Sequence, residues 1–329
     1  MNPRLVIVAL LGVGLAAYLI FYVGFGAVIS AALTVGWSGF AILVALGLAL
    51  LVLLGAAWHV LVQGMTLSRF STFLWGRMVR DSAAEVLPFS QVGGFVIGAR
   101  AVLLRGIAAP VAFASTIVDV TTEMMAQIAY VALGIVLLAL RAPQTAYTAS
   151  LTGVLVMGVV AAAIAGGLFI AVQRSGVRIT EKLASHWLPE TLAHAAAVAA
   201  SVDAIYRAPA RIGASFAIHL CGWFAGAGLT WLTFKMIGTH LDLAAVVAID
   251  SLVYAARSAA FVVPNALGVQ EAAYAVLSSL FGVGPELGLA VSLLKRARDI
   301  AIGAPVLLLW QAMEGSHAVA PERNFLKTE

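Results

Sequence analysis

Charged side chains interrupt several long apolar stretches of this sequence, and their spacing limits the chemistry they could support. Asp119 and Glu123 lie four residues apart, so a helix places both carboxylates on one face. In the second half, Arg257, Glu271 and the run 295–299 stand within or beside apolar segments. Carboxylates at such positions can act as general acids or bases, whereas Arg binds phosphate through paired hydrogen bonds. Both acid–base chemistry and recognition of an anionic headgroup are therefore open.

Charges inside a bilayer need partners. An ionised side chain at the centre of a membrane helix costs at least about 2.5 kcal/mol, so it normally faces a cavity or an opposite charge. The three cations of the run 295–299 could be neutralised by Glu271, by Asp250, by the Asp119 and Glu123 pair, or by an anionic ligand. We expect Glu271 to lie within salt-bridge reach of Arg257, Arg296 or Arg298. The alternatives are that the run is a cytoplasmic loop and that the carboxylate pair only fixes helix packing.

A short pattern of Arg, Pro and Gly occurs once in each half of the chain. In both copies an Arg precedes a Pro by seven or eight residues, and Gly follows four or five residues later. Pro removes a backbone donor and Gly weakens a helix, so each copy predicts a broken or re-entrant helix. Breaks at matching positions of two halves indicate a transporter's binding site, the alternative being two unrelated loop breaks. The pattern residues are Arg80, Pro88, Gly93 and Gly94, then Arg257, Pro264 and Gly268.

The composition determines the class of protein. The chain has 329 residues, of which 62% are hydrophobic and only 10% are charged, against about 25% charged in soluble domains. No Asp, Glu, Lys or Arg occurs between Leu5 and Ser68. Because about 20 apolar residues span a bilayer, this stretch holds two spans. The sequence predicts an all-α, polytopic integral membrane bundle with two pseudo-repeated halves.

The expected organisation is a single transmembrane domain over residues 1–315. Its halves cover 1–172 and 207–313, joined by a polar cytoplasmic loop over 173–206 with a helix near its end, and residues 316–329 form a short tail. Basic loop residues favour the cytoplasmic side, which places both termini inside and the protein in the inner (plasma) membrane. Whether residues 70–87 cross the membrane stays open.

Several classes of function are disfavoured. The single cysteine, Cys221, excludes a disulfide within the chain and a metal cluster built on thiolates. No nucleotide-binding loop, zinc-protease or hydrolase motif stands in a usable context, and no basic–aromatic pattern indicates nucleic acid. We therefore expect no cofactor and no metal, with membrane lipids as partners and lipid-synthesis enzymes or a second copy of the chain as further partners.

At the residue level the chain resembles a known family. The stretch from Val263 through Pro264, Gly268 and Glu271, followed by Gly282 and Arg296, resembles the lysylphosphatidylglycerol synthase/flippase transmembrane family. The stretch with Leu87-Pro88, Gly93-Gly94, Arg100, Leu104 and Gly106 is similar to that family's other signature, except that Phe95 stands where an acidic residue is frequent. The segment 87–94, Leu-Pro-Phe-Ser-Gln-Val-Gly-Gly, is similar to the corresponding segment of the family branch found with hopanoid biosynthesis genes.

The resemblance implies a lipid-handling membrane domain that moves a lipid between leaflets. Family members that synthesise aminoacylated lipid use a separate soluble domain, and we expect no such activity here because the sequence ends at Glu329. The leading hypothesis is a flippase-like transporter of an aminoacyl-phospholipid or hopanoid-type lipid. A membrane-embedded lipid-modifying transferase and a non-catalytic scaffold for lipid synthesis are the alternatives.

The transporter hypothesis predicts a water-accessible cavity open sideways to lipid. Its expected lining is Arg80, Arg100, Glu271, Arg296 and Arg298. The full set of candidate lipid-binding residues is Arg80, Pro88, Gly93, Gly94, Arg100, Asp119, Glu123, Arg257, Pro264, Gly268, Glu271, Arg296 and Arg298.

Overall fold

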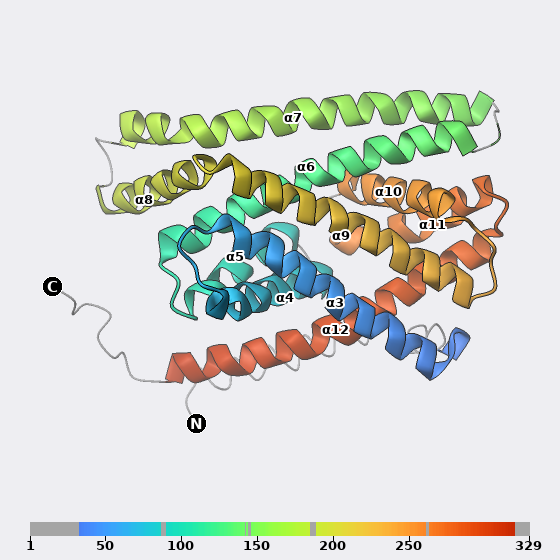
Figure 1. Cartoon of the computed structure of the whole chain (residues 1–329), viewed down its shortest axis with the longest axis horizontal. Coiled ribbons are helices and arrows are strands. Elements are labelled where there is room, and N and C mark those ends of the chain that lie inside the picture. Colours follow the sequence, from blue (N-terminus) through green and yellow to red (C-terminus); the bar gives the residue numbers. More distant parts are fainter. Residues whose placement is uncertain are drawn as a thin grey trace.

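The computed structural model describes residues 33–86, 90–141, 143, 146–184, 189–260 and 263–319. Regular structure within these residues is helical and includes no strand, which confirms the all-α class (Figure 1). Four stretches are long and apolar enough to cross a membrane: α3 (Gly36–Leu61), α6 (Ala109–Arg141), residues 149–173 of α7 and α9 (Pro209–Met236). The first predicted span, residues 5–29, lies outside the described residues.

Helix α7 as a whole covers Ala146–Ala184. The remaining helices are η1 (Leu67–Arg69), α4 (Phe70–Val86), α5 (Ser90–Leu103), α8 (Pro189–Tyr206), α10 (Leu243–Ala259), η2 (Pro264–Ala266), α11 (Val269–Leu280) and α12 (Pro285–Val319).

The same order of helices occurs twice. A long helix, a helix of 17 residues, a short helix and a second long helix form α3–α6 and again α9–α12. The matching lengths are 26 and 28 residues for α3 and α9, 14 and 12 for α5 and α11, and 33 and 35 for α6 and α12. Helices α3–α6 and α9–α12 therefore form two structural repeats, while α7 and α8 lie between them in the chain.

The two repeats have opposite orientations. Matching helices α3 and α9 pack along their lengths, and the start of each meets the end of the other (Figure 1). A Cβ atom at Gly39 would lie 3.6 Å from Met236 Sδ, whereas Arg211 Nη1 donates to the Val60 carbonyl at 2.9 Å. Antiparallel matching helices require an inverted-topology repeat, the arrangement of many secondary transporters.

In each repeat the 17-residue helix and the short helix form an antiparallel hairpin. At the open end of the first hairpin, Arg69 Nη1 donates to the Arg105 carbonyl at 3.1 Å. In the second, Arg257 Nη1 donates to Gln270 Oε1 at 2.8 Å near the break, and the Tyr274 hydroxyl donates to Asp250 Oδ1 at 2.6 Å further along. Each hairpin also packs on the last long helix of the other repeat, α4 on α12 and α10 on α6.

The two breaks agree with the sequence to different extents. In the second, Asn265 and Ala266 adopt left-handed backbone with φ of 48° and 46°, and Gly268 has φ of 75°, so the predicted break is confirmed. The first turn falls at residues 87–89, which include Pro88 and lie outside the described residues. Gly93 and Gly94 do not break a helix, because both lie inside α5.

The predicted polar loop 173–206 is helical wherever it is described. Helix α7 continues through Ala184, and α8 covers the segment where a helix was expected. Polar side chains there bind one another: the Tyr206 hydroxyl donates to Gln173 Oε1 at 2.8 Å, and Gln173 Nε2 donates to Thr121 Oγ1 at 2.9 Å. These contacts give the polar residues internal partners, so high polarity did not require a loop.

Candidate functional site

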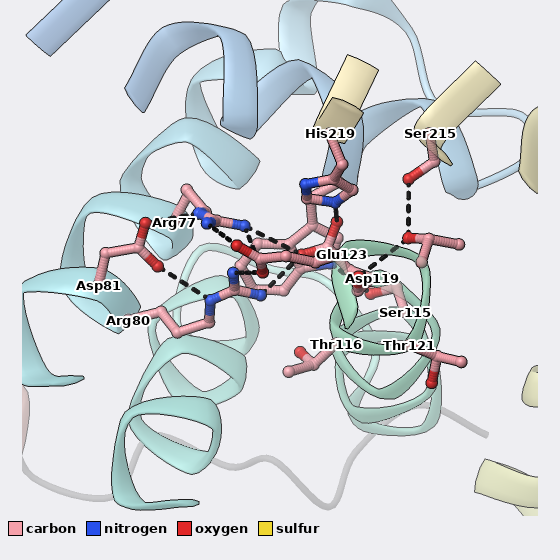
Figure 2. A network of polar contacts seen from close by, with 12 residues as sticks. Arg77, Arg80, Asp81, Ser115, Thr116, Asp119, Thr121, Glu123, Ser215 and His219 are labelled. Carbon is pink, nitrogen blue, oxygen red and sulfur yellow. Dashed lines mark hydrogen bonds and ion pairs between the residues drawn. The ribbon is translucent and has the colours of Figure 1, made fainter. Parts of the chain in front are cut away.

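A dense group of ionisable side chains lies where α4, α6 and α9 meet (Figure 2). We call it the first-repeat cluster, and its members are Arg77, Arg80, Asp81, Asp119, Glu123 and His219. Arg80 contacts Asp119 Oδ2 at 2.6 Å and Glu123 Oε2 at 2.5 Å. Arg77 contacts Glu123 Oε1 at 2.6 Å and Asp81 Oδ2 at 2.7 Å. The two arginines thus bridge three carboxylates.

Helix geometry gathers this cluster. Arg77, Arg80 and Asp81 share one face of α4, and the spacing of Asp119 and Glu123 places both on the opposing face of α6. His219 from α9 completes it, with Nε2 2.9 Å from Asp119 Oδ1. Asp119 and Glu123 share one face of α6, as their spacing predicts, but they bind Arg77 and Arg80 of α4 and not the cations of the run 295–299.

One subset of the cluster has metal-ligand chemistry. Ligand atoms of Asp119, Glu123 and His219 lie within 4.8 Å of one another. However, Arg77 and Arg80 already bind both carboxylates, and a metal cation would have to displace those guanidinium groups. Since Arg stays protonated in proteins, the arrangement is an ion-pair cluster and does not fit a metal centre.

A second cluster occupies the matching place in the other repeat. Lys295 Nζ lies 2.6 Å from Asp250 Oδ1, and Thr230 and Tyr274 donate to the same oxygen at 2.8 and 2.6 Å. Tyr130 donates to Asp250 Oδ2 at 3.2 Å. We call these five residues the second-repeat cluster. Asp250, one of the partners expected for the basic run, does neutralise one of its cations, Lys295.

The two clusters correspond by position and are reversed in sign. Arg77 and Asp250 are the eighth residues of α4 and α10, while Asp119 and Lys295 are the eleventh residues of α6 and α12. In the first repeat the cation therefore stands on the hairpin, and in the second it stands on the long helix. Each hairpin is tied to its own repeat by a buried ion pair.

The two hairpins contact each other beside their breaks. Arg257 Nη2 donates to Glu85 Oε1 at 2.7 Å, and Asn265 Nδ2 donates to the Glu85 carbonyl at 2.5 Å. Glu85 lies next to the last residue of α4, and Asn265 lies in the left-handed break. We call Glu85, Arg257 and Asn265 the break junction. Its existence means that the two broken segments meet, as far as they are described.

Glu271 is held between its own helix start and α12. Its Oε1 lies 2.7 Å from Arg296 Nη2, so the predicted pairing is confirmed, and its Oε2 accepts the Gly268 backbone N–H at 2.8 Å. The other two candidate partners bind elsewhere. Arg257 belongs to the break junction, and Arg298 pairs with the adjacent Asp299 at 2.6 Å.

Of the five residues expected to line one cavity, only Glu271 and Arg296 bind each other. Arg80 binds Asp119 and Glu123, whereas Arg100 binds Glu314, far along the chain on α12. Glu314 also lines a small pocket, together with Trp75, Ala101, Leu104, Arg105, Trp310 and Met313. The structure thus distributes the expected lining over separate ion pairs.

Sequence reasoning missed several members of these sites: Arg77, Asp81, Glu85, Tyr130, His219, Thr230, Asn265 and Tyr274. Arg77 could have been found, because it stands one helical turn before Arg80 and therefore shares its face. His219 and Tyr274 carry no such signal, since a single polar residue in an apolar helix is common and its partners come from other helices.

Comparison with known proteins agrees with these features. Residues 8–306 match the model of the family described as the lysylphosphatidylglycerol synthase TM region. No curated protein and no solved structure matches the chain. With four candidate spans and a family match over most of its length, the chain is a multi-pass membrane protein that belongs to the lysylphosphatidylglycerol synthase transmembrane-region family.

Proposed function

We propose that this protein is a flippase-like transporter that moves a polar-headed lipid between leaflets. The observation that carries the proposal is the break junction, where two broken hairpins of an inverted repeat meet through Glu85, Arg257 and Asn265. In transporters with inverted repeats, the substrate binds where discontinuous helices of the two repeats face each other. We further propose that the hairpins are re-entrant and open to opposite sides of the membrane.

The chemistry of the junction suits an anionic group. Arg257 and Arg296 are largely buried, and each is neutralised by one internal carboxylate, Glu85 or Glu271. A lipid phosphate carries the same sign as these carboxylates and accepts paired hydrogen bonds from a guanidinium. A headgroup could therefore exchange with the carboxylates. Exchange at Arg257 would release the contact between hairpins, which connects lipid binding to their separation.

The lipid would be an aminoacyl-phospholipid or a hopanoid-type lipid, as the family resemblance implies. In either case the apolar tail stays in the bilayer while only the headgroup passes the junction. This transfer needs no donor substrate.

The test is leaflet exchange by purified protein in vesicles of phosphatidylglycerol and phosphatidylethanolamine. Fluorescent phosphatidylglycerol, an aminoacylated phospholipid and a hopanoid are the probes, and external dithionite bleaches the outer leaflet. We expect the wild type to raise the bleached fraction of at least one probe above that of protein-free vesicles. Arg257→Gln should abolish the gain, whereas Arg207→Gln, in an exposed pair on α8 and its end, should keep it.

Three outcomes would overturn the proposal. No redistribution of any probe by a correctly folded protein would exclude the transporter. Modification of a lipid upon addition of a donor would favour the transferase, and recovery of lipid-synthesis enzymes without either activity would favour the scaffold.

A further inference from the structure

The first-repeat cluster carries a surplus charge. Its two guanidinium groups, on Arg77 and Arg80, face three carboxylates, on Asp81, Asp119 and Glu123. With a neutral imidazole on the sixth member, His219, the cluster therefore has one net negative charge. An uncompensated charge is costly in a buried site, and one added cation would remove that cost.

The ion pairs of the second repeat and of the break junction are balanced in the described residues. Lys295 faces Asp250, Arg296 faces Glu271, Arg298 faces Asp299 and Arg257 faces Glu85, one cation to one anion each. Among the ion pairs of the described residues, the surplus negative charge is thus specific to the first-repeat cluster.

The cluster has a buried end and a partly exposed end. The side chains of Asp119 and His219 are 0% exposed, whereas those of Asp81 and Glu123 are 26% and 21% exposed. Ligand atoms of Glu123, Asp119 and His219 lie within 4.8 Å of one another, a span that one water molecule can bridge. Glu123, which is partly exposed, therefore lies close to the buried imidazole (Figure 2).

The imidazole is only half satisfied. His219 Nε2 bonds to Asp119, but the buried Nδ1 has no hydrogen-bond partner. A neutral ring leaves Nδ1 as an unused acceptor, and a doubly protonated ring would leave it as an unused donor. A protonated His219 would thus gain Coulomb energy while lacking an acceptor in this packing, so protonation favours a shift of α9 against α4 and α6.

Among the described residues, no charged side chain other than Asp119 makes a hydrogen bond or ion pair with His219. Helix α3 contributes Trp58, which donates to Ser115, and Ser215 on α9 bonds with Thr122. The charged groups of the remaining helices around α9 are committed elsewhere: Asp203 of α8 pairs with Arg207, Asp250 of α10 and Lys295 of α12 belong to the second-repeat cluster, and Arg296, Arg298 and Asp299 of α12 pair as described above.

We propose that the first-repeat cluster is a binding site for one proton, held by the hydrogen-bonded pair of His219 and Asp119. The proton enters from water past Asp81 and Glu123 and leaves by the same groups. Resting on the lipid transport proposed above, we assign this proton as the coupling ion of the transporter. Binding of the proton cancels the surplus negative charge of the cluster. The Nδ1–H of the protonated His219 ring then lacks an acceptor, which drives the shift of α9 against α4 and α6.

Direct detection of the proton does not depend on transport. Protein with 15N-labelled imidazole rings is placed in lipid nanodiscs, and nitrogen NMR spectra are recorded between about pH 5 and 8, the range in which His commonly titrates. We expect one ring signal, absent in His219→Gln, to change from the neutral to the doubly protonated pattern as the pH falls. A signal that keeps one pattern throughout would overturn the site, as would a change driven by Na⁺ at constant pH.

Variants that change the net charge of the cluster test whether the surplus negative charge is what favours protonation of His219. Glu123→Gln and Asp81→Asn each remove the surplus negative charge and leave the histidine in place. In both, the His219 ring should remain neutral at pH values where the wild type is protonated. Ser215→Ala, which removes a neighbouring hydroxyl without changing charge, should titrate like the wild type. An unchanged titration in both charge variants would overturn the charge-balance argument even if one of them folds poorly.

The coupling is tested with the probe lipid that the wild type transports. We expect a transmembrane pH gradient to bias its steady-state distribution several-fold, and His219→Gln to lose that bias; His59→Gln, a histidine outside the cluster, should retain it. Transport with equal bias in His219→Gln would overturn coupling and leave the transporter intact. A titrating His219 without any lipid movement would overturn the transporter and keep the proton site.

Discussion

At the scale of single residues, the fold depends on buried charges that are bound to one another. Asp250 is 0% exposed and receives hydrogen bonds from Lys295, Thr230, Tyr274 and Tyr130. These hydrogen bonds satisfy the Asp250 carboxylate. The cost of removing that carboxylate from water is therefore offset only while all of its partners remain.

Removing either Lys295 or Asp250 alone should therefore destabilise the protein more than removing both. Lys295→Met leaves Asp250 buried without its cation, and we expect a loss of about 3–5 kcal/mol in unfolding free energy. The double change Lys295→Met with Asp250→Leu should recover part of that loss. Thermal unfolding in detergent measures both, and equal stability of the single and double variants would contradict the buried pairing.

An exposed pair provides the control. Arg141 and Asp242 are 2.6 Å apart, but their side chains are 50% and 56% exposed. Arg141→Met should change the unfolding free energy by no more than about 1 kcal/mol.

Asp242 also gives a pH dependence outside the membrane. Its side chain accepts the Ala245 backbone N–H at the start of α10, which holds the pKa of that carboxyl below its ordinary value of 3.8. A lowered pKa in the folded state stabilises the protein above the ordinary value, and this contribution is lost as the pH falls through the lower one. The stability advantage of wild type over Asp242→Asn should therefore shrink on acidification. An advantage that is constant down to about pH 3 would show that the carboxylate is not involved.

At the scale of elements, the hairpins are held by close helix contact. A Cβ atom at Gly94 would lie 2.8 Å from the Arg80 carbonyl oxygen, and one at Gly98 would lie 2.7 Å from Arg80 Cβ. These glycines allow α5 to approach α4 closely at Arg80. The contact between the two helices therefore fixes where the Arg80 side chain points.

Adjacent glycines in α5 allow a matched test. Gly94→Ala forces backbone atoms apart and should destabilise the protein by about 1–3 kcal/mol. Gly93→Ala meets no atom within 4 Å and removes the helix penalty of Gly, so its melting temperature should be equal or higher. If both variants melt together, the close contact between α4 and α5 is not present in solution.

At the scale of the whole molecule, inversion of the repeats determines which loops face each side. The loop that holds Ser68 precedes the first hairpin, and the loop that holds His240 precedes the second. In an inverted repeat these equivalent loops lie on opposite sides of the membrane. From the charge bias of the sequence, we predict that the basic residues near the first loop face the cytoplasm.

Labelling from one side tests the inversion. In a Cys221→Ala background, Ser68→Cys and His240→Cys are treated with a membrane-impermeant maleimide on intact cells. We expect reaction at His240→Cys and protection of Ser68→Cys until the membrane is permeabilised. Reaction of both from the same side would require parallel repeats.

Much of this protein was determined by local sequence. Long apolar runs fixed the membrane class and the approximate positions of α3, α6 and α9, because burial of the backbone in lipid leaves helices as the available structure. The Pro and Gly pattern located the second break, and the spacing of Asp119 and Glu123 placed them on one helix face. The carboxylate partner of Arg296 was also predictable, since buried charges need opposite charges.

Only the tertiary structure decided how these elements combine. The direction of one repeat relative to the other, the pairing of Arg257 with Glu85 and the arrival of His219 beside Asp119 all join residues more than 90 positions apart. Sequence spacing describes neighbours on one helix, whereas these contacts depend on how separate helices pack. For the same reason Gly94 looked like a break in the sequence and is a packing contact in the fold: a residue without a side chain serves either purpose, and its neighbours from other elements determine which.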